Sequence, residues 1–375
     1  MAGRGVKRRR HLRLVESLDA RQLMYFTSNS LPSISVIIPT LNSEKTLRES
    51  LRSICTQDYP QDKLEIIISD GGSTDSTPEI VKLIGTETLI KIKYIPNTLK
   101  TGEAGKAEGF RHSANEIIAF IDSDNILPES NWFLKMVEPF NDAQIFASEP
   151  LEYTCRANDG YITRYCAYIG MNDPLCLFLG NYDRYCTLTG RWTEVPHIEE
   201  DLGRYLKIEL EKKRFPTIGA NGFLIRRSAL EKCGVGDYLF DIDVIYELLN
   251  ATDSTGEVVR FAKVKTGIIH IFSGDVKTFA RKQRRRIRDY LYYNSLGVRK
   301  YPWKSVSSLR LLFFIISCMT LLPLLLQALR GYFKRPNSAW LFHPIACWLT
   351  LFEYGLGKAG SVFGVRELRR QGWSQ

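Results

Sequence analysis

Two aspartates separated by one serine, Asp122 and Asp124, are the residues with the clearest chemical potential in this sequence. They follow the apolar run 117–121, whose lack of alternation predicts a strand buried on both faces. An open α/β sheet places its ligand crevice at the carboxyl ends of such strands. Two carboxylates there could hold a divalent cation, although an ordinary polar turn after a strand would have the same composition.

Two earlier segments, 34–39 and 64–70, are mostly apolar, are expected to be strands and lead into turn-forming residues. Segments with helical periodicity follow each strand, and a further strand is expected at about 90–95. This alternation predicts a mainly parallel sheet covered by helices, in which the strand ends meet at one edge. The polar or turn-forming residues at the first two ends are Pro39, Thr40, Asn42 and Asp70.

A later turn contains Gly219, Asn221 and Gly222. Its glycines would let the backbone approach a ligand closely, although a plain tight turn would look the same. Asp241 follows this turn and is an acidic candidate. Its rivals are Asp243 and the acidic cluster 199–201, and a solvated surface is the preferred interpretation of that cluster.

Four more side chains could contribute to such a site. Lys106 could balance phosphate charge, or it could simply be a solvated residue on a helix. Gln283 and Arg286 share one helix face, where the arginine could bind a diphosphate or the run could bind anionic lipid headgroups. His270 could be a further metal ligand or a hydrogen-bonded structural residue.

The chain has 375 residues and a formal net charge of +10, with basic residues crowded into 4–10 and 281–304. Such crowding is typical of proteins that bind nucleic acid or an anionic membrane. The basic tail has no apolar core or cleavage site of a signal peptide, which argues against secretion. The eight cysteines form no Cys-x-x-Cys pair and are expected to be reduced thiols.

The C-terminal part contains nineteen consecutive uncharged residues, 311–329. As one helix they would be about 28 Å long, so we expect a membrane helix that Pro323 kinks. The second apolar segment, 339–352, is shorter and could span or be re-entrant. The dense basic block before residue 311 places the large domain on the cytosolic side.

Six stretches in a fixed order resemble the family 2 glycosyltransferases, which have a GT-A fold. The resemblance runs from Ser35 to about Leu248, more than half of the chain. The stretches are SVIIPTLN at 35–42, EIIISDGGSTDST at 65–77, the helix start from Lys106 to Gly109, EIIAFIDSDN at 116–125, GANGFLIRRSAL at 219–230 and FDID at 240–243.

This resemblance implies a role for each candidate residue. Asp122 and Asp124 resemble the metal-binding Asp-x-Asp of the family, so Mg²⁺ or Mn²⁺ is the expected cofactor. The loop with Pro39, Thr40 and Asn42 resembles the base-binding edge, and Asp70 the carboxylate that contacts the nucleoside. Gly219, Asn221 and Gly222 would approach the sugar or the acceptor, with Lys106 near the phosphates. Asp241 aligns with the general base, and Gln283 and Arg286 resemble the Gln-x-x-Arg-Trp signature of membrane polysaccharide synthases, with Ile287 in place of the tryptophan.

We therefore expect an inverting glycosyltransferase on the cytosolic membrane face, using a nucleoside-diphosphate sugar and a polyprenyl or other lipid-linked acceptor. Anionic membrane lipids are expected partners and nucleic acid is not. The alternatives are a processive polysaccharide synthase and a non-enzymatic basic protein that binds membranes or nucleic acid. The expected parts are a basic arm (1–30), a GT-A domain (31–275) with an insertion or lid (151–215), basic juxtamembrane helices (276–308), one or two membrane segments (309–357) and a basic tail (358–375).

Overall fold

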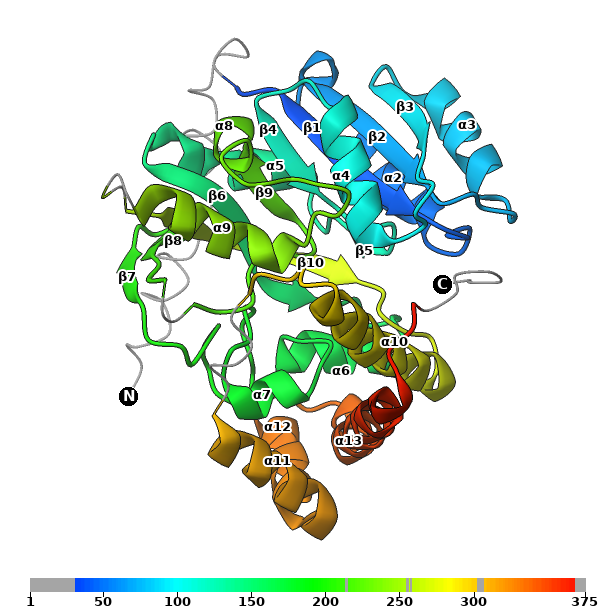
Figure 1. The fold of residues 1–375 in the computed structure, drawn as a ribbon. Helices are drawn as coiled ribbons and strands as arrows, with labels where there is room; N and C mark the ends of the chain where they lie inside the picture. Colours follow the sequence, from blue (N-terminus) through cyan, green and yellow to red (C-terminus); the bar gives the residue numbers. More distant parts are fainter. Residues whose placement is uncertain (1–30, 213–214, 254–255, 257, 302–306, 368–375) are drawn as a thin grey trace, which may run out of the picture.

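The computed structural model describes residues 31–212, 215–253, 256, 258–301 and 307–367 (Figure 1). The basic arm expected at residues 1–30 and the last eight residues of the tail lie outside this description. Ten strands form a single sheet in the order β3-β2-β1-β4-β9-β6-β10-β8-β7, and β5 pairs with β10. The fold is therefore an α/β arrangement around one continuous sheet.

The N-terminal half of the sheet is parallel, as the sequence pattern predicts. In register, β1 places Ile34 beside Leu64 of β2 and Ile117 of β4, and β2 pairs with β3. β1, β2 and β4 are mostly apolar and buried, whereas the edge strand β3 alternates lysine with apolar residues, and all four end at the same sheet edge. The bounds are β1 Ile34–Thr40, α2 Leu47–Cys55, η3 Gln61–Lys63, β2 Leu64–Asp70, α3 Thr77–Glu87, β3 Lys91–Pro96, α4 Gly102–His112 and β4 Ile117–Phe120.

The other half of the sheet differs from the expected mainly parallel arrangement. Strand β9 runs antiparallel to both of its neighbours, β4 and β6, and β10 is parallel to β6 but antiparallel to β5 and β8. The sheet is therefore mixed, because the rhythm of alternating strands and helices ends after β4. The bounds are β5 Asn125–Ile126, α5 Trp132–Val137, η4 Glu138–Asn141, β6 Ile145–Thr154, β9 Phe223–Arg226, α8 Arg227–Leu230, α9 Asp241–Asp253 and β10 Arg260–His270.

Segment 151–215, expected as an insertion or lid, both covers and extends the sheet. Helices α6 (Tyr161–Ile169) and α7 (Leu175–Leu179) pack outside it, whereas β7 (Ile198–Asp201) and β8 (Tyr205–Glu209) form its far edge (Figure 1). Strand β8 pairs antiparallel with β10. The start of the segment is the end of β6 itself.

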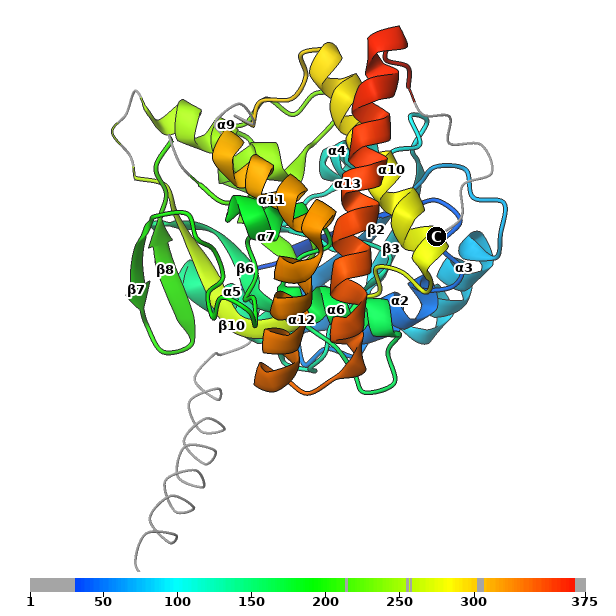
Figure 2. The same ribbon diagram turned by 90° about the horizontal axis from the view of Figure 1, so that it is seen from below.

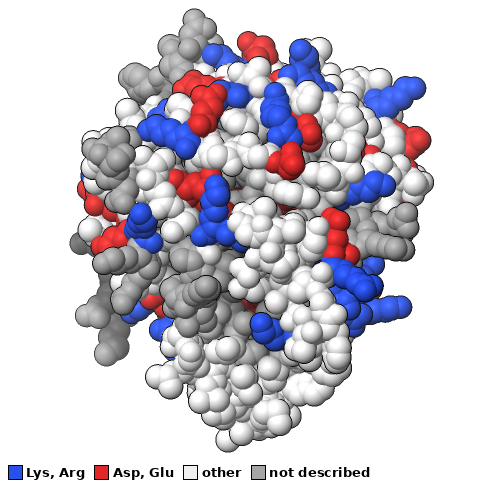
Figure 3. Space-filling model, viewed as in Figure 1, with Lys and Arg blue, Asp and Glu red and all other residues white. Residues whose placement is uncertain are grey.

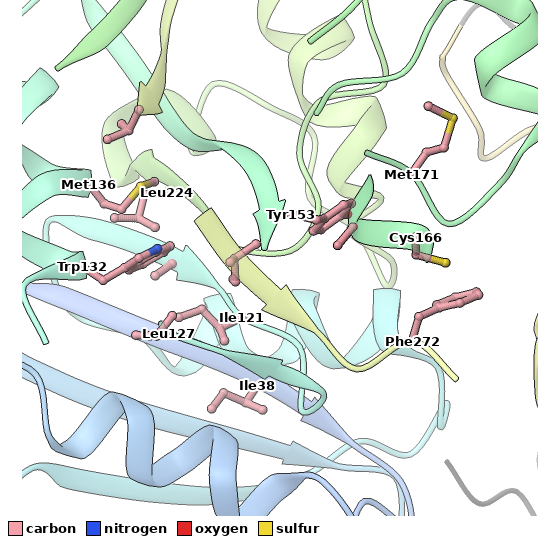
Figure 4. Packing of buried hydrophobic residues seen from close by; sticks show 14 of the residues in the cluster. Ile38, Ile121, Leu127, Trp132, Met136, Tyr153, Cys166, Met171, Leu224 and Phe272 are labelled. Atoms are coloured by element: carbon pink, nitrogen blue, oxygen red, sulfur yellow. The ribbon is translucent and has the colours of Figure 1, made fainter. Parts of the chain in front are cut away.

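Apolar residues cover both faces of the sheet. On one face, Val36 and Ile38 of β1 pack in a cluster with Leu51 of α2, while Ile37 points the other way into a cluster with Ala107 of α4 and residues of α8 and α9. Alternate residues of one strand thus bury both layers, as expected for a sheet covered by helices. Figure 4 shows the first cluster extending from Ile38 and Ile121 to Tyr153 and Phe272.

The C-terminal helices lie together on one side of the molecule (Figure 2). Helix α10 (Val276–Ser295) packs along α13 (His343–Gly360), and η6 (Ser338–Phe342) and η7 (Ser361–Phe363) flank α13. The prediction of one helix over residues 311–329 is wrong. This segment is divided between α11 (Ser308–Thr320) and α12 (Leu322–Lys334), which meet at 90°. Within the described residues, no individual helix has both the length and the hydropathy to cross a bilayer, and the bent pair meets that test only when combined.

Candidate active site

A pocket of about 310 Å³ lies at the carboxyl ends of β1 and β4, bordered by α4, α9 and α10. It collects side chains, most of them polar, from segments that are far apart in the sequence. They include Pro39, Thr40, Lys106, Asp122, Asp124, Asn172, Asn221, Asp241, His270, Arg281, Lys282, Arg285 and Arg286. The pocket therefore brings together most of the residues that the sequence marked as candidates.

Asp124 is the buried anion of the pocket, with 5% of its surface exposed. One carboxylate oxygen lies 3.3 Å from His270 Nε2 and the other 3.3 Å from Lys282 Nζ. Burial alone would raise the pKa of Asp124, but the charges of His270 and Lys282 hold it below its ordinary value. The same burial lowers the pKa of Lys282. Asp124 is therefore ionised and lies between His270 of β10 and Lys282 of α10.

Lys106 connects the two acidic parts of the pocket. Its Nζ lies 3.3 Å from Asp122 Oδ1 and donates a hydrogen bond to Asp241 Oδ2. Burial alone would lower the pKa of Lys106, but these two carboxylates raise it above its usual value. Burial raises the pKa of Asp241, against the opposing charge of Lys106. Lys106 is thus a buried, charged residue and not a solvated one.

Small residues on α4 let this lysine reach the pocket. A Cβ added to Gly109 would lie 2.3 Å from Ile37 Cγ2, and one added to Gly105 would lie 2.7 Å from Pro39 Cβ. Helix α4 therefore approaches β1 more closely than larger residues would allow. Thr101 caps its first turn by accepting a hydrogen bond from the amide of Ala104. The helix start is consequently fixed beside the strand end.

The turn before β9 is held by buried charges. Arg184, which is fully buried, donates hydrogen bonds to the carbonyl oxygens of Ala220 and Asn221. Glu149 accepts a hydrogen bond from the amide of Gly219 and pairs with Arg184 at 2.6 Å. Asn221 has φ +55° and accepts a hydrogen bond from Asn125. The network links this turn to the segment that follows Asp124.

Gln283 and Arg286 lie side by side on α10. The guanidinium of Arg286 donates a 2.6 Å hydrogen bond to Gln283 Oε1 and reaches the carbonyl of Asn172. Gln283 is fully buried and donates to the same carbonyl. Only Arg286 of the two lines the pocket. The structure therefore makes Gln283 a residue that holds Arg286 and the Asn172 segment.

Some predicted binding residues lie beside the pocket without lining it. Asp70 accepts hydrogen bonds from Thr40, from the Ser73 hydroxyl and from the amides of Gly72 and Ser73. Burial alone would raise the pKa of Asp70, but these hydrogen bonds hold it below its ordinary value. Asn42 donates its amide to Ser73 Oγ. Asn42, Asp70, Gly219 and Gly222 are not among the side chains that border the cavity.

The rivals of Asp241 have other partners. Asp243 is bound by the guanidinium of Arg299 at 2.8 Å and by the amide of Lys300. Residues 199–201 form the exposed edge strand β7, where Asp201 pairs with Lys265. Neither lines the pocket. Of the three acidic candidates, only Asp241 does.

Apart from Arg286, the sequence interpretation missed the cationic side chains that α10 adds to the pocket. Lys282 and Arg286 are four residues apart, as are Arg281 and Arg285, so each pair lies on one side of the helix. The four-residue spacing can be read from the sequence, but basic residues occur on every side of this helix, so the sequence does not show which side faces the pocket. Asn172, whose Nδ2 lies 3.0 Å from His270 Nδ1, had no signal in the sequence.

The donor set fits a hard divalent cation. Among the described residues, no group of three or more His, Cys, Asp or Glu side chains forms a metal cage. Mg²⁺ does not require one, because it is usually bound by one or two carboxylates together with substrate phosphates. Asp122 and Asp124 supply two carboxylates in the pocket, and His270 lies beside the second.

Comparison with known proteins identifies a family model that matches residues 35–234, described as Glycosyl transferase family 2. The chain is 28% identical over 211 residues to the probable glycosyltransferase YdaM of Bacillus subtilis, covering 55% of this chain and 43% of that protein. It is 36% identical over 99 residues to a GalNAc(5)-diNAcBac-PP-undecaprenol beta-1,3-glucosyltransferase of Campylobacter jejuni, covering 26% of this chain and 31% of that protein. The matched part is thus less than half the length of either relative.

Among solved structures, the chain is similar to a mannosyltransferase, PcManGT from Pyrobaculum calidifontis, in complex with GDP-Man and Mn²⁺. The sequences are 15% identical, and the TM-score is 0.43 over 95% of this chain and 84% of that chain.

Proposed function

The chain belongs to glycosyl transferase family 2, whose model covers 200 of its 375 residues (35–234), and we propose that it transfers a sugar from a nucleoside-diphosphate donor to an acceptor at a membrane surface. The observation that carries this proposal is the meeting of Asp124, Lys106 and Asp241 in one pocket with the cationic side chains of α10. These groups match the charges that such a transfer creates.

The donor diphosphate departs with additional negative charge, which the pocket can stabilise. Arg286 presents a planar guanidinium, and Lys282 an ammonium group, from the same side of α10. Charge-assisted hydrogen bonds from such groups to phosphate oxygens are about twice as strong as neutral ones. Gln283 fixes the direction of Arg286, so little reorganisation is needed when the charge develops.

Asp122 and Asp124 would hold Mg²⁺ or Mn²⁺, which when bound supplies Lewis-acid neutralisation of the diphosphate charge. The protein prepares Asp124 for this role by keeping it ionised at low exposure. The relative position of Asp122 and Asp124 is fixed by Asn125, whose side chain accepts a hydrogen bond from the amide of Asp122.

Asp241 would act as the general base in an inverting transfer. A base must take the proton of the acceptor hydroxyl as that oxygen attacks the sugar carbon, and a raised pKa improves a carboxylate for this work. If the acceptor is instead a polyprenyl phosphate, it is already an anion at neutral pH. Asp241 would then orient the acceptor, and its removal would cost less activity than the removal of Asp124.

A lipid-linked acceptor on the cytosolic membrane face is the preferred class. The Campylobacter jejuni relative carries undecaprenol in its name. In this chain, α10 contributes to the pocket and also packs along α13, whose outer side is apolar. Most of the basic run 281–304 belongs to α10, and positive charge in such a helix beside an apolar surface would favour the cytosolic leaflet.

The test is release of nucleoside diphosphate by the purified chain in detergent, with a panel of nucleotide sugars and with Mn²⁺ or EDTA. We expect metal-dependent release that Asp124→Asn reduces at least about 100-fold, since electrostatic groups of this kind contribute that much. The control is Asp201→Asn, the same change at the exposed edge strand. Full turnover by Asp124→Asn would refute the assignment of the cation site.

The acceptor class needs a separate measurement. After incubation with membranes and a radiolabelled donor, organic extraction separates labelled lipid from labelled polymer. Label in the lipid fraction would support the proposed acceptor. Label only in a polymer would instead support a processive synthase.

A further inference from the structure

The three C-terminal helices each bury one narrow stripe and leave a broad apolar face exposed. Helix α11 buries Phe314 and Cys318, and α12 buries Leu324 and Ala328. On their outer sides Met319 is 73% and Phe333 is 75% exposed. Exposed apolar patches of this extent mark interaction sites, because water-exposed surfaces of single proteins rarely carry them.

This face has a simple charge pattern. From residue 308 to residue 352 there is no Asp or Glu, and the charged residues are Arg310, Arg330, Lys334 and Arg335. Figure 3 shows the corresponding lower end of the molecule as a white surface, with the red and blue side chains gathered above it. Glu353 of α13 is buried and paired with Arg284. An apolar face whose own exposed charged residues are cations is complementary to an anionic lipid surface.

Both ends of the α11–α12 pair are attached to the catalytic domain. At the start of α11, Arg310 donates a hydrogen bond to the carbonyl of Leu179 and pairs with Glu194. At the end of α12, Lys334 donates hydrogen bonds to the carbonyl oxygens of Thr187 and Leu188. The pair therefore leaves the domain and returns to it on the same side.

The lengths of α11 and α12 agree with a pair of helices that leaves the domain and returns to it on the same side. Each helix has 13 residues, or about 20 Å, which is shorter than the roughly 30 Å hydrocarbon core of a bilayer. They meet at 90° at Leu321, whose φ is +59°. Helix α13 continues the apolar face with Trp348 and Phe352, and its buried side packs against α10, α11 and α12.

We propose that α11, α12 and α13 lie in the plane of an anionic membrane, inserted into one leaflet without crossing it, and so hold the pocket at the lipid surface. The inference rests on the proposed function for the identity of the acceptor, but the binding itself needs no catalysis. It specifies how this pocket would reach a lipid-linked acceptor: the apolar chain stays in the leaflet while its polar head enters beside α10.

Flotation with liposomes tests the surface. The full chain is mixed with vesicles of phosphatidylcholine alone or with 30% phosphatidylglycerol, and we expect stronger binding to the anionic vesicles. Leu312→Glu and Phe333→Glu, which change exposed residues of α11 and α12, should each reduce bound protein at least about tenfold, because burying one charge is costly. Leu89→Glu, at a 92% exposed apolar residue in the connection between α3 and β3, is the matched control and should bind as the wild type does.

Nucleoside-diphosphate release in detergent is measured on the same variants. It should remain at the wild-type level, so that loss of flotation with retained release separates this inference from the proposed function. Flotation of Phe333→Glu at the wild-type level would overturn the inference. So would sedimentation showing that the face joins two copies of the chain while lipid binding is absent.

A labelling experiment tests whether the helices cross. Ser338→Cys lies at the start of η6, between α12 and α13, and Thr86→Cys lies on α3 of the catalytic domain. In sealed vesicles that present the domain outward, a membrane-impermeant maleimide should label both positions, after subtraction of the labelling of the native cysteines. Labelling of the Ser338 position only after the vesicles are opened would show a crossing and contradict the inference.

Discussion

Lys106 and Asp241 form an ion pair across the pocket, although 135 residues separate them in the chain. The lysine comes from α4 and the aspartate from the first turn of α9. Because the same ammonium group lies 3.3 Å from Asp122, it connects the candidate base to the Asp122–Asp124 segment. A change at one of these three residues is therefore expected to alter the other two.

We predict strong thermodynamic coupling between Lys106 and Asp241. Lys106→Met leaves a largely buried carboxylate without its cation, which should destabilise the fold by about 3 kcal/mol. Adding Asp241→Asn removes that carboxylate charge, so the double variant should recover at least about 1 kcal/mol relative to the sum of the single changes. Urea denaturation of the four proteins gives the coupling energy. Additive effects would show that the pair does not act as a unit.

Gly219 is expected to control the position of Asp241. Its φ is +130°, and an added Cβ would lie 2.3 Å from the backbone oxygen of Asp241. Gly219→Ala should therefore displace the start of α9 and lower kcat at least about tenfold, since small misplacements at a reacting centre are costly. Gly85→Ala, on α3 with open space around it, should leave kcat unchanged. Equal kcat values for the two variants would contradict this role.

The parts of the fold that the sequence predicted are those fixed by local patterns. Strand β4 is an uninterrupted apolar run, β1 and β2 are mostly apolar, and the helix after β1 has clear periodicity. The mixed half of the sheet depends on pairings such as β6 with β10, which are long-range and have no local signature. In the apolar segment 311–329, Pro323 marks the first turn of α12 and not a kink within one helix.

The residues of the candidate site also divide into those with a local sequence signal and those that depend on tertiary contacts. Asp122 and Asp124 were recognisable because they end a buried strand, whereas Lys282 belongs to a basic run in which several residues look equivalent. Which of them enters the pocket depends on how α10 is rotated against α13. That rotation is fixed by tertiary contacts such as Ile287 against Gly357, where an added Cβ would lie 2.7 Å from Ile287 Cγ2.

The buried charges under the glycine turn should give stability a specific pH dependence. Burial raises the pKa of Asp183 from its ordinary value of 3.8 to about 6, against the opposing charge of Arg184. The folded state thus binds this proton more tightly than the unfolded chain, so its contribution to stability falls as the pH rises from about 4 to 6. Asp183→Asn carries no charge and should gain up to about 3 kcal/mol relative to wild type over this window.

Urea denaturation of both proteins between pH 4 and pH 8 measures this difference. Asp201→Asn provides the control, because the carboxylate of Asp201 is exposed and its pKa is lowered by Lys265. The Asp201→Asn control should not gain stability relative to wild type as the pH rises. A difference between wild type and Asp183→Asn that stays constant with pH would show that Asp183 has an ordinary pKa in the folded protein.

The contact between α13 and α10 should influence donor binding. Arg284 of α10 donates two 2.7 Å hydrogen bonds to the buried carboxylate of Glu353 on α13. The next residue of α13, Tyr354, donates a 2.5 Å hydrogen bond to Asp173. The carboxylate of Asp173 in turn lies 3.8 Å from the guanidinium of Arg286 on α10. Glu353→Gln weakens the first contact and should let α10 shift. Because Lys282 and Arg286 move with that helix, we expect the KM for the donor to rise about tenfold, equivalent to about 1.4 kcal/mol, with a smaller change in kcat.

Glu87→Gln is the matched control for this substitution. It removes the charge of an exposed pair with Arg52, at 3.5 Å, far from the pocket lining. Exposed pairs of this kind contribute at most about 1 kcal/mol to stability, so both the KM and the stability should stay close to wild type. If Glu353→Gln lowers the unfolding free energy but leaves the KM unchanged, then α13 supports the fold without positioning α10. A raised KM in Glu353→Gln alone would instead show that the helix proposed to lie in the membrane also sets the position of the cations that bind the donor.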